Sequence, residues 1–185
     1  LPAMSGTIGK LKTEVMSERV KLINPECTVN IIDDFISPEN QSDYLNRGYD
    51  YVIDAIDNVR TKASLIAYCK RNKINVITIG GAGGQTDPIQ IQIADLSKTI
   101  QDPLLAKVRS VLRKDYNFSQ NPKRKFSIDA VFSTQPLIFP QMTEGCAISA
   151  TMNCANGFGA ATMITATFGF FAVSRVIDKL LKKKS

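Results

Sequence analysis

The feature that most constrains the fold is a short apolar strand, Tyr51–Asp54, that passes almost directly into a helical pattern. The joining residues are Asp54-Ala-Ile-Asp57-Asn58, and the helix is predicted over about Val59–Asn72. Open α/β sheets repeat this strand-and-helix unit and bind their ligands at the carboxyl ends of the strands. Asp57 is therefore expected at that edge, where a carboxylate can hold a metal ion that bridges phosphates.

Strands and helices alternate on both sides of this run. The periodicity predicts a helix over Leu11–Ile23, a strand at Thr28–Ile32, a helix that starts at Ser37-Pro38 and ends near Gly48, and a strand at Asn75–Ile79. Such alternation is typical of a Rossmann-like α/β fold built on a parallel sheet.

The pattern changes after Ile79. Gly80-Gly-Ala-Gly-Gly84-Gln85 leaves the strand, and Ile89, Ile91 and Ile93 then alternate with polar residues, as in a half-exposed antiparallel strand. The remaining predicted elements are a helix from Asp102-Pro103 to about Lys114, a strand at Ala130–Phe139 and a final helix over Gly157–Leu181. We therefore expect a parallel sheet that continues into antiparallel strands.

The composition excludes several kinds of chemistry. The chain of 185 residues contains no histidine, so Ser-His and Cys-His mechanisms within it are excluded. Its four cysteines form no closely spaced pair, which argues against a zinc site and against a disulfide scaffold. A single domain in a reduced, cytoplasmic protein is the simplest interpretation.

Positive charge is concentrated in two segments of a chain whose net charge is +6. A basic helix and loop are predicted over residues 100–127, and a second basic cluster ends the chain. Tyr116 and Phe118 lie among the cations of the first segment, a combination compatible with RNA binding. The alternative is a solvated helix face followed by a polar loop. The candidate RNA-binding residues are Arg109, Arg113, Lys114, Lys123, Arg124 and Lys125.

Two residues of the predicted nucleotide site have simpler interpretations. Asp57 and Asn58 precede a helix, so either could cap it instead of binding a ligand. Lys12 lies at the start of the first predicted helix, where a lysine can reach phosphates, although spacing alone favours a solvated lysine. The residues themselves leave both questions open.

The glycine run and the cysteines also allow more than one role. Gly80–Gly84 lacks the spacing of known phosphate-binding loops, which favours a flexible connection between a parallel and an antiparallel strand. Cys146 and Cys154 are candidate nucleophiles; Cys154 precedes a predicted helix start, which would favour the thiolate. Inert thiols are expected at Cys27 and Cys69, and an inert thiol is also slightly favoured over a nucleophile at Cys154.

An uncharged stretch, Cys154–Ser174, overlaps the last predicted helix and approaches the length of a membrane span, roughly 20 residues. Its threonines and glycines, and the α/β pattern that precedes it, favour a buried packing helix. Membrane association through this helix is the alternative.

Seven segments form an ordered series that resembles one branch of the ubiquitin-activating (E1-like, ThiF-type) adenylating superfamily, the tRNA threonylcarbamoyladenosine dehydratases. They are Gly9-Lys-Leu-Lys12, Ile23-Asn-Pro25, Asp54–Asn58, Gly80–Gln85, Thr99–Pro103, Val131–Thr134 and Asn153–Thr162. The Asp-Asn and Gly-x-x-Lys elements indicate the superfamily. Gly80–Gln85 and Gly157–Thr162 indicate the dehydratase branch.

The resemblance implies ATP-dependent cyclisation of a threonylcarbamoyl group on tRNA, through an adenylated carboxylate and with loss of water. It implies that Lys12, Asp57 and Asn58 contact ATP and that Asp57 binds Mg²⁺ and neutralises charge during catalysis. Cys154 is a further catalytic candidate from its position alone. It also implies a homodimer and partners from sulfur-carrier and cysteine desulfurase systems.

The chain departs from the superfamily pattern at its start. The Gly-x-Gly-Gly-x-Gly loop, an acidic ribose-binding residue and the Asn-x-x-Arg element are not found, and we expect this first strand-loop-helix of the nucleotide site to lie upstream of Leu1. Two alternative functions are therefore kept. One is activation of a ubiquitin-like sulfur-carrier protein, and the other is a truncated, non-catalytic module that binds RNA or a partner.

Overall fold

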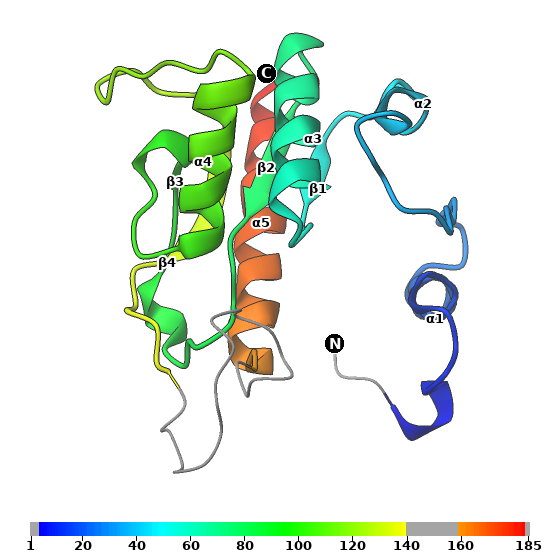
Figure 1. Cartoon of the computed structure of the whole chain (residues 1–185). Helices are drawn as coiled ribbons and strands as arrows, with labels where there is room; N and C mark the ends of the chain where they lie inside the picture. Colours follow the sequence, from blue (N-terminus) through cyan, green and yellow to red (C-terminus); the bar gives the residue numbers. More distant parts are fainter. Residues whose placement is uncertain (1–3, 140–158, 184–185) are drawn as a thin grey trace. The chain divides into compact units, whose positions relative to one another are not determined.

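A computed structural model describes residues 4–139 and 159–183 of the chain (Figure 1). The chain separates into two compact units, Leu1–Ile36 and Ser37–Ser185. The first unit contains a short 3₁₀ helix, η1 (Ser5–Thr7), and helix α1 (Lys12–Ile23). Helix α1 ends at Asn24-Pro25 as predicted, because proline cannot continue the hydrogen-bonding pattern of a helix.

The second unit is built on one mixed sheet of four strands in the order β1-β2-β4-β3. Strands β1 (Val52–Asp54), β2 (Val76–Ile79) and β4 (Asp129–Ser133) are parallel, and β3 (Ile91–Asp95) runs antiparallel to β4. The predicted Rossmann-like sheet, parallel and then antiparallel, is confirmed.

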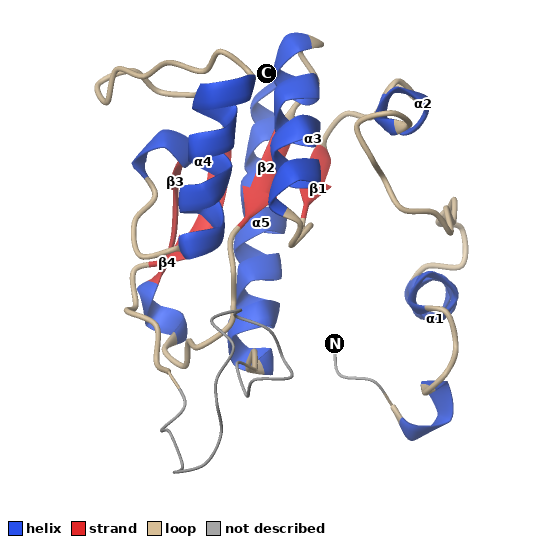
Figure 2. Ribbon diagram, viewed as in Figure 1, coloured by secondary structure: helices blue, strands red, loops and turns tan. Residues whose placement is uncertain are grey.

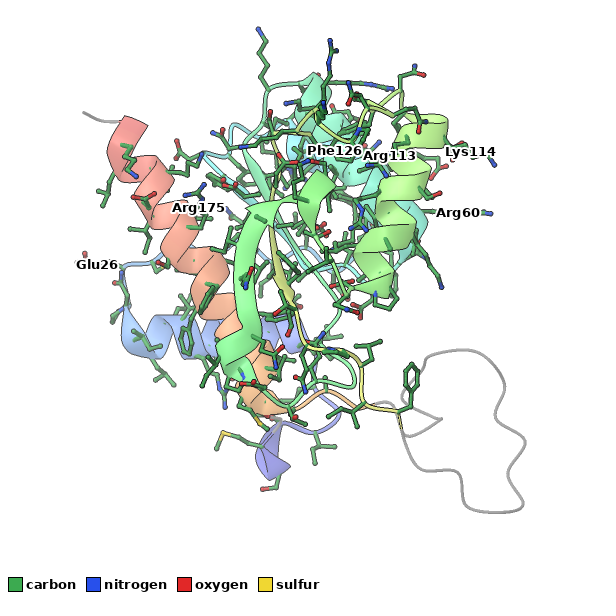
Figure 3. The ribbon with its side chains drawn as sticks, turned by 90° about the vertical axis from the view of Figure 1, so that its left-hand side faces the viewer. Glu26, Arg60, Arg113, Lys114, Phe126 and Arg175 are labelled. Carbon is green, nitrogen blue, oxygen red and sulfur yellow. The ribbon has the colours of Figure 1, made fainter. Side chains whose placement is uncertain are left out.

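Helices cover both faces of this sheet (Figure 2). Helices α3 (Val59–Arg71) and α4 (Pro103–Asp115) lie on one face, and α5 (Thr162–Lys183) lies on the other, as the side view in Figure 3 also shows. The short helix α2 (Gln41–Leu45) precedes β1, and the 3₁₀ turns η2 (Pro88–Gln90) and η3 (Leu96–Lys98) flank β3. This three-layer arrangement is typical of α/β proteins.

The final helix α5 is a packing helix. Its side chains Ile164, Phe168, Ala172 and Val176 are buried against Ile77, Ile91 and Val131 of the sheet. They recur at intervals of four residues, which places them on one face of the helix. No helix in the described part of the chain is both long enough and apolar enough to cross a membrane.

Three sequence predictions need correction. Thr28–Ile32 is not a strand, because the described part of the first unit offers no second strand with which its backbone could pair. The strand predicted at Ala130–Phe139 ends at Ser133, which pairs with Ile91, the first residue of β3. Beyond it Thr134 still donates its N–H to the Gln90 carbonyl oxygen (3.0 Å), but Gln90 belongs to the 3₁₀ turn η2, so the ladder of strand pairing stops there. The helix predicted from Ser37 begins at Gln41 after a turn, although Ser37 Oγ does accept a hydrogen bond from the Glu39 N–H (3.3 Å).

Candidate functional site

Three parallel strands end at the same edge of the sheet, and the loops that follow them carry the candidate site. The loop after β1 spans residues 55–58 and leads into α3; the loop after β2 begins at Gly80. Strand β4 is followed by Thr134 and Gln135. Parallel α/β sheets bind ligands at this carboxyl edge, so the sequence prediction placed Asp57 at the correct end of the sheet.

Asn58, and not Asp57, is the residue that caps α3. Its Oδ1 accepts a hydrogen bond from the Thr61 N–H (3.0 Å), and its backbone is extended, as an N-cap residue requires. The cap interpretation of Asp57 is therefore wrong. Asp57 is exposed, and within the described residues its carboxylate has no hydrogen-bond or ion-pair partner. A carboxylate in this state can take a cation.

Behind this loop, Asp54 and Lys62 form an ion pair from which solvent is excluded. The distance from Lys62 Nζ to Asp54 Oδ2 is 3.0 Å, and both side chains are 0% exposed. Asp54 Oδ2 also accepts a hydrogen bond from Thr78 Oγ1 on β2 (2.7 Å). Burial lowers the pKa of Lys62, and the nearby Asp54 carboxylate opposes that change. The Asp54 carboxylate therefore faces neighbouring structure and not solvent.

The same pair also holds the loop that carries Asp57. Lys62 Nζ donates to the Ile56 carbonyl oxygen (3.0 Å), and the Ile56 N–H donates to Asp54 Oδ1 (3.0 Å). Both backbone polar groups of Ile56 are thus hydrogen-bonded, directly before Asp57. Lys62 was not among the predicted site residues. Lys62 precedes Leu65, Ile66 and Cys69 by three, four and seven residues, and those residues form the buried stripe of α3. This helical spacing is the sequence signal that predicts a buried position for Lys62.

The glycine loop after β2 packs tightly against Asp102, the N-cap residue of α4. Asp102 Oδ2 accepts from the Gly81 N–H (2.9 Å), and Oδ1 accepts from the Leu105 N–H (2.8 Å). Burial raises the pKa of Asp102, while its backbone hydrogen bonds oppose that rise. The predicted cap at Asp102-Pro103 is confirmed, and the glycine run does connect the parallel strand β2 to the antiparallel strand β3.

Gly80→Ala is expected to destabilise the fold by about 2–3 kcal/mol, because overpacking a buried site distorts its neighbours. A Cβ atom at residue 80 would lie 1.9 Å from Asp102 Oδ2, inside the van der Waals limit. Gly81→Ala is the matched control. Its Cβ would lie 3.8 Å from Leu104 Cβ, which is an ordinary contact. Urea unfolding measures both variants, and equal losses of stability would show that the close approach at Gly80 is not the cause.

Two glutamines at this edge were not predicted. Gln135 is buried, and its Oε1 accepts hydrogen bonds from the Thr86 and Asp87 N–H groups (both 2.9 Å). Gln85 is also buried, and its Nε2 donates to the Gly81 carbonyl oxygen (3.0 Å). Its Oε1 receives no hydrogen bond within the described ranges. The glycine loop is therefore anchored by Gln85, which belongs to the Gly80–Gln85 segment, and by Gln135, which lies outside every recognised segment.

The other candidate residues do not join this cluster in the described structure. Lys12 is the first residue of α1, is exposed and belongs to the first unit, whose position relative to Asp57 is not described. Cys146 and Cys154 lie outside the described residues. Cys27 is half-buried, and Cys69 is buried, with burial raising the pKa of its thiol to about 12. Cys69 is therefore an inert thiol, as predicted.

The six candidate RNA-binding residues fall into two groups. Arg109 donates to Thr99 Oγ1, and Arg113 lies over the Phe126 ring (5.3 Å to the ring centroid), as Figure 3 shows, so both support local structure. Lys114 points away from the body of the second unit in the same view. The remaining cations are exposed in the loop after α4: Lys123, Arg124 and Lys125.

No cluster of three or more acidic, cysteine or histidine side chains that could bind a metal ion occurs in the described part of the chain. A dedicated protein cage for a metal is therefore not found there. Mg²⁺ needs no such cage, because it commonly binds one or two carboxylates, water and substrate phosphates. The exposed Asp57 carboxylate fits that requirement.

Comparison with known proteins identifies the family. The model of the ThiF family matches residues 3–185. The chain belongs to the ThiF family. This ThiF-family chain is 98% identical over 185 residues to the tRNA threonylcarbamoyladenosine dehydratase of Haemophilus influenzae, covering 100% of this chain and 71% of that protein. It is 56% identical over 189 residues to the Escherichia coli dehydratase, covering 98% and 70% of the two chains.

Solved structures agree with this assignment. The Escherichia coli tRNA N6-threonylcarbamoyladenosine dehydratase in complex with ATP matches with a TM-score of 0.87 at 53% identity, over 98% of this chain and 68% of that one. The same enzyme in complex with AMP matches with a TM-score of 0.87. The fold predicted for this ThiF-family chain is therefore confirmed as E1-like.

Proposed function

We propose that this chain catalyses the ATP-dependent dehydration of threonylcarbamoyladenosine in tRNA. The observation that carries the proposal is the exposed Asp57 carboxylate at the carboxyl edge of the sheet, in a chain so similar to known dehydratases of this nucleoside. The related Escherichia coli enzyme has been solved with ATP and with AMP, which supports adenylation as the activating step.

The chemistry has two steps. The threonine carboxylate attacks the α-phosphorus of ATP, which forms a mixed anhydride and releases pyrophosphate. The threonylcarbamoyl group then attacks the activated carbonyl carbon through its own carbamoyl group. The ring closes, a proton is lost and AMP leaves. The nucleoside therefore loses one water overall, and its oxygen leaves with AMP.

Within this scheme Asp57 would hold Mg²⁺, and the ion would supply positive charge to neutralise the phosphates. Asn58 orients the start of α3 beside it by capping the helix, and its amide is the second nucleotide contact in the proposal. Lys12 contacts the phosphates, in keeping with its place at the start of α1. Cys154 remains a catalytic candidate from sequence alone.

The test is an assay with modified tRNA. The full-length protein is incubated with ATP, Mg²⁺ and tRNA that carries threonylcarbamoyladenosine, and the nucleosides are then analysed by mass spectrometry. We expect the loss of one water from the modified nucleoside and the formation of AMP. Pyrophosphate exchange that depends on a small sulfur-carrier protein, without this mass change, would instead support the alternative adenylating function. RNA binding with neither activity would support the non-catalytic module.

The exposed cations of the loop after α4 are proposed to bind the tRNA backbone. A variant in which Lys123, Arg124 and Lys125 are changed to Ala is expected to bind tRNA about tenfold more weakly at moderate salt, with a shallower salt dependence. The AMP and ATP affinities should not change. Lys21, Lys70 and Lys73, replaced together by Ala, provide a charge-matched control at other exposed positions. Filter binding at several salt concentrations measures both, and equal losses would refute a specific role for the loop.

The other expectations stay predictions. A homodimer and partners from sulfur-carrier and cysteine desulfurase systems follow from the resemblance, and sedimentation and affinity capture would test them. The cysteine pattern favours the cytoplasm. The E1-like domain is expected to span the whole chain, 1–185.

A further inference from the structure

We infer that Lys62 is a positioning residue for the nucleotide site, which it serves by fixing the loop that presents Asp57. The inference rests on the proposed function in one respect, since it takes Asp57 as the residue that meets the metal and ATP. Lys62 itself cannot touch a ligand in this arrangement, because its side chain is fully buried.

The first argument is the cost of burying a charge at this position. A lysine on the inner face of α3 must lose its hydration, and this is tolerated only where a partner charge and hydrogen-bond acceptors replace the water. Lys62 finds Asp54 Oδ2 at 3.0 Å and the Ile56 carbonyl oxygen at 3.0 Å. A leucine or methionine at position 62 would continue the apolar stripe of α3 without any such requirement. Packing alone therefore does not explain the positive charge of Lys62, which favours a functional role for it.

The second argument is which groups the pair holds. The two members of the ion pair hold the same residue, Ile56. Lys62 donates to its carbonyl oxygen, and Asp54 accepts from its N–H. Ile56 is the last residue before Asp57, and Asn58 then begins α3 through its cap. The chain around Asp57 is thus held on its amino-terminal side by a buried ion pair and on its carboxyl-terminal side by the helix cap.

The third argument is that the Asp54–Lys62 pair is also hydrogen-bonded to the neighbouring strand β2. Asp54 ends β1, and its Oδ2 is also bound by Thr78 Oγ1 of β2. Asp102, which anchors the glycine loop after β2 through the Gly81 N–H, adds a further negative charge near Lys62. Lys62 thereby places the Asp57 loop relative to the next strand of the sheet. Groups that orient a ligating carboxylate commonly change metal affinity or activity by about 10- to 100-fold when removed.

The experiment uses full-length protein that carries both Lys62→Met and Asp54→Asn. Methionine keeps the length of the lysine stem, and removing both charges leaves no lone buried ion, so the double variant is the one expected to fold. Hydrogen exchange of peptides that cover residues 55–58 is measured together with ATP binding by calorimetry, with and without Mg²⁺. Lys70→Met, at an exposed position on the same helix, is the matched control.

We expect faster exchange confined to residues 55–58 and about tenfold weaker ATP binding in the presence of Mg²⁺. Binding without Mg²⁺ should change less, and the Lys70→Met control should match the wild type. Lys62→Arg, which keeps a cation and several donors, should restore part of the affinity. A folded double variant with wild-type exchange in this loop and wild-type affinity would overturn the inference.

The two proposals fail in different ways. If the wild-type protein neither binds ATP nor dehydrates the nucleoside, the proposed function is wrong. The exchange measurement on residues 55–58 still decides whether Lys62 fixes this loop. If the wild type is active and the double variant is equally active, only the positioning role of Lys62 is refuted.

Discussion

Asp57→Asn is expected to lower kcat/KM for tRNA dehydration about 100- to 1,000-fold, the usual cost of removing one group that stabilises developing charge. Asparagine has nearly the same shape as aspartate but brings no negative charge to a bound cation. The effect should be on chemistry and nucleotide binding, because no described residue depends on the Asp57 carboxylate for a hydrogen bond or an ion pair.

The thermal midpoint of Asp57→Asn should therefore stay close to that of the wild type, since substitutions at exposed positions usually change stability by less than about 0.5 kcal/mol. Asp115→Asn at the end of α4 is the matched control, as an exposed aspartate in the same unit. The measurement is the initial rate of nucleoside dehydration by mass spectrometry. Wild-type activity in Asp57→Asn would show that Asp57 has no role in catalysis, and it would remove the main support for the proposed site.

Lys62→Met alone is expected to destabilise the protein by about 3–5 kcal/mol, because it leaves the Asp54 carboxylate buried without its counter-ion. Asp54 would keep its hydrogen bonds from Thr78 and from the Ile56 N–H, which satisfy its oxygens but do not replace the lost positive charge.

The double variant with Asp54→Asn should recover most of that stability, since buried ion pairs are often replaceable by neutral groups at little cost. Urea unfolding of the wild type, both single variants and the double variant gives the coupling energy between the two residues. If the losses in unfolding free energy of the two single variants simply add in the double variant, the ion pair itself contributes nothing to stability.

The sheet and its helices could largely be predicted from sequence because their signals are local. The β1–α3 unit shows an apolar strand followed by 3.6-residue periodicity, and Asp102-Pro103 marks the start of α4 directly. Thr28–Ile32 shows the limit of such signals. Its composition suits a strand, but a strand exists only if another segment pairs with it, and periodicity says nothing about that.

The candidate site was predicted less completely because its supports come from distant parts of the chain. Asp57 was recognisable from its place after a strand. The side chains that anchor Asp54 and the glycine loop were not, since Thr78 lies 24 residues from Asp54 and Gln135 lies 49 residues from Thr86. Only the fold brings these side chains together. Lys62 looked like an ordinary helix lysine until its place on the apolar stripe was compared with its burial.

Gly84 has a consequence for how this protein family can vary. Its N–H donates to the Gly159 carbonyl oxygen (3.1 Å), and its carbonyl oxygen accepts from the Ile138 N–H (2.8 Å). The chain that leaves the region of β4 and the chain that returns to α5 are therefore tied to one residue. Because Gly84 has a positive φ of 69°, a conformation that a residue with a Cβ atom rarely adopts, we expect glycine to be retained at this position wherever both segments are held in this way.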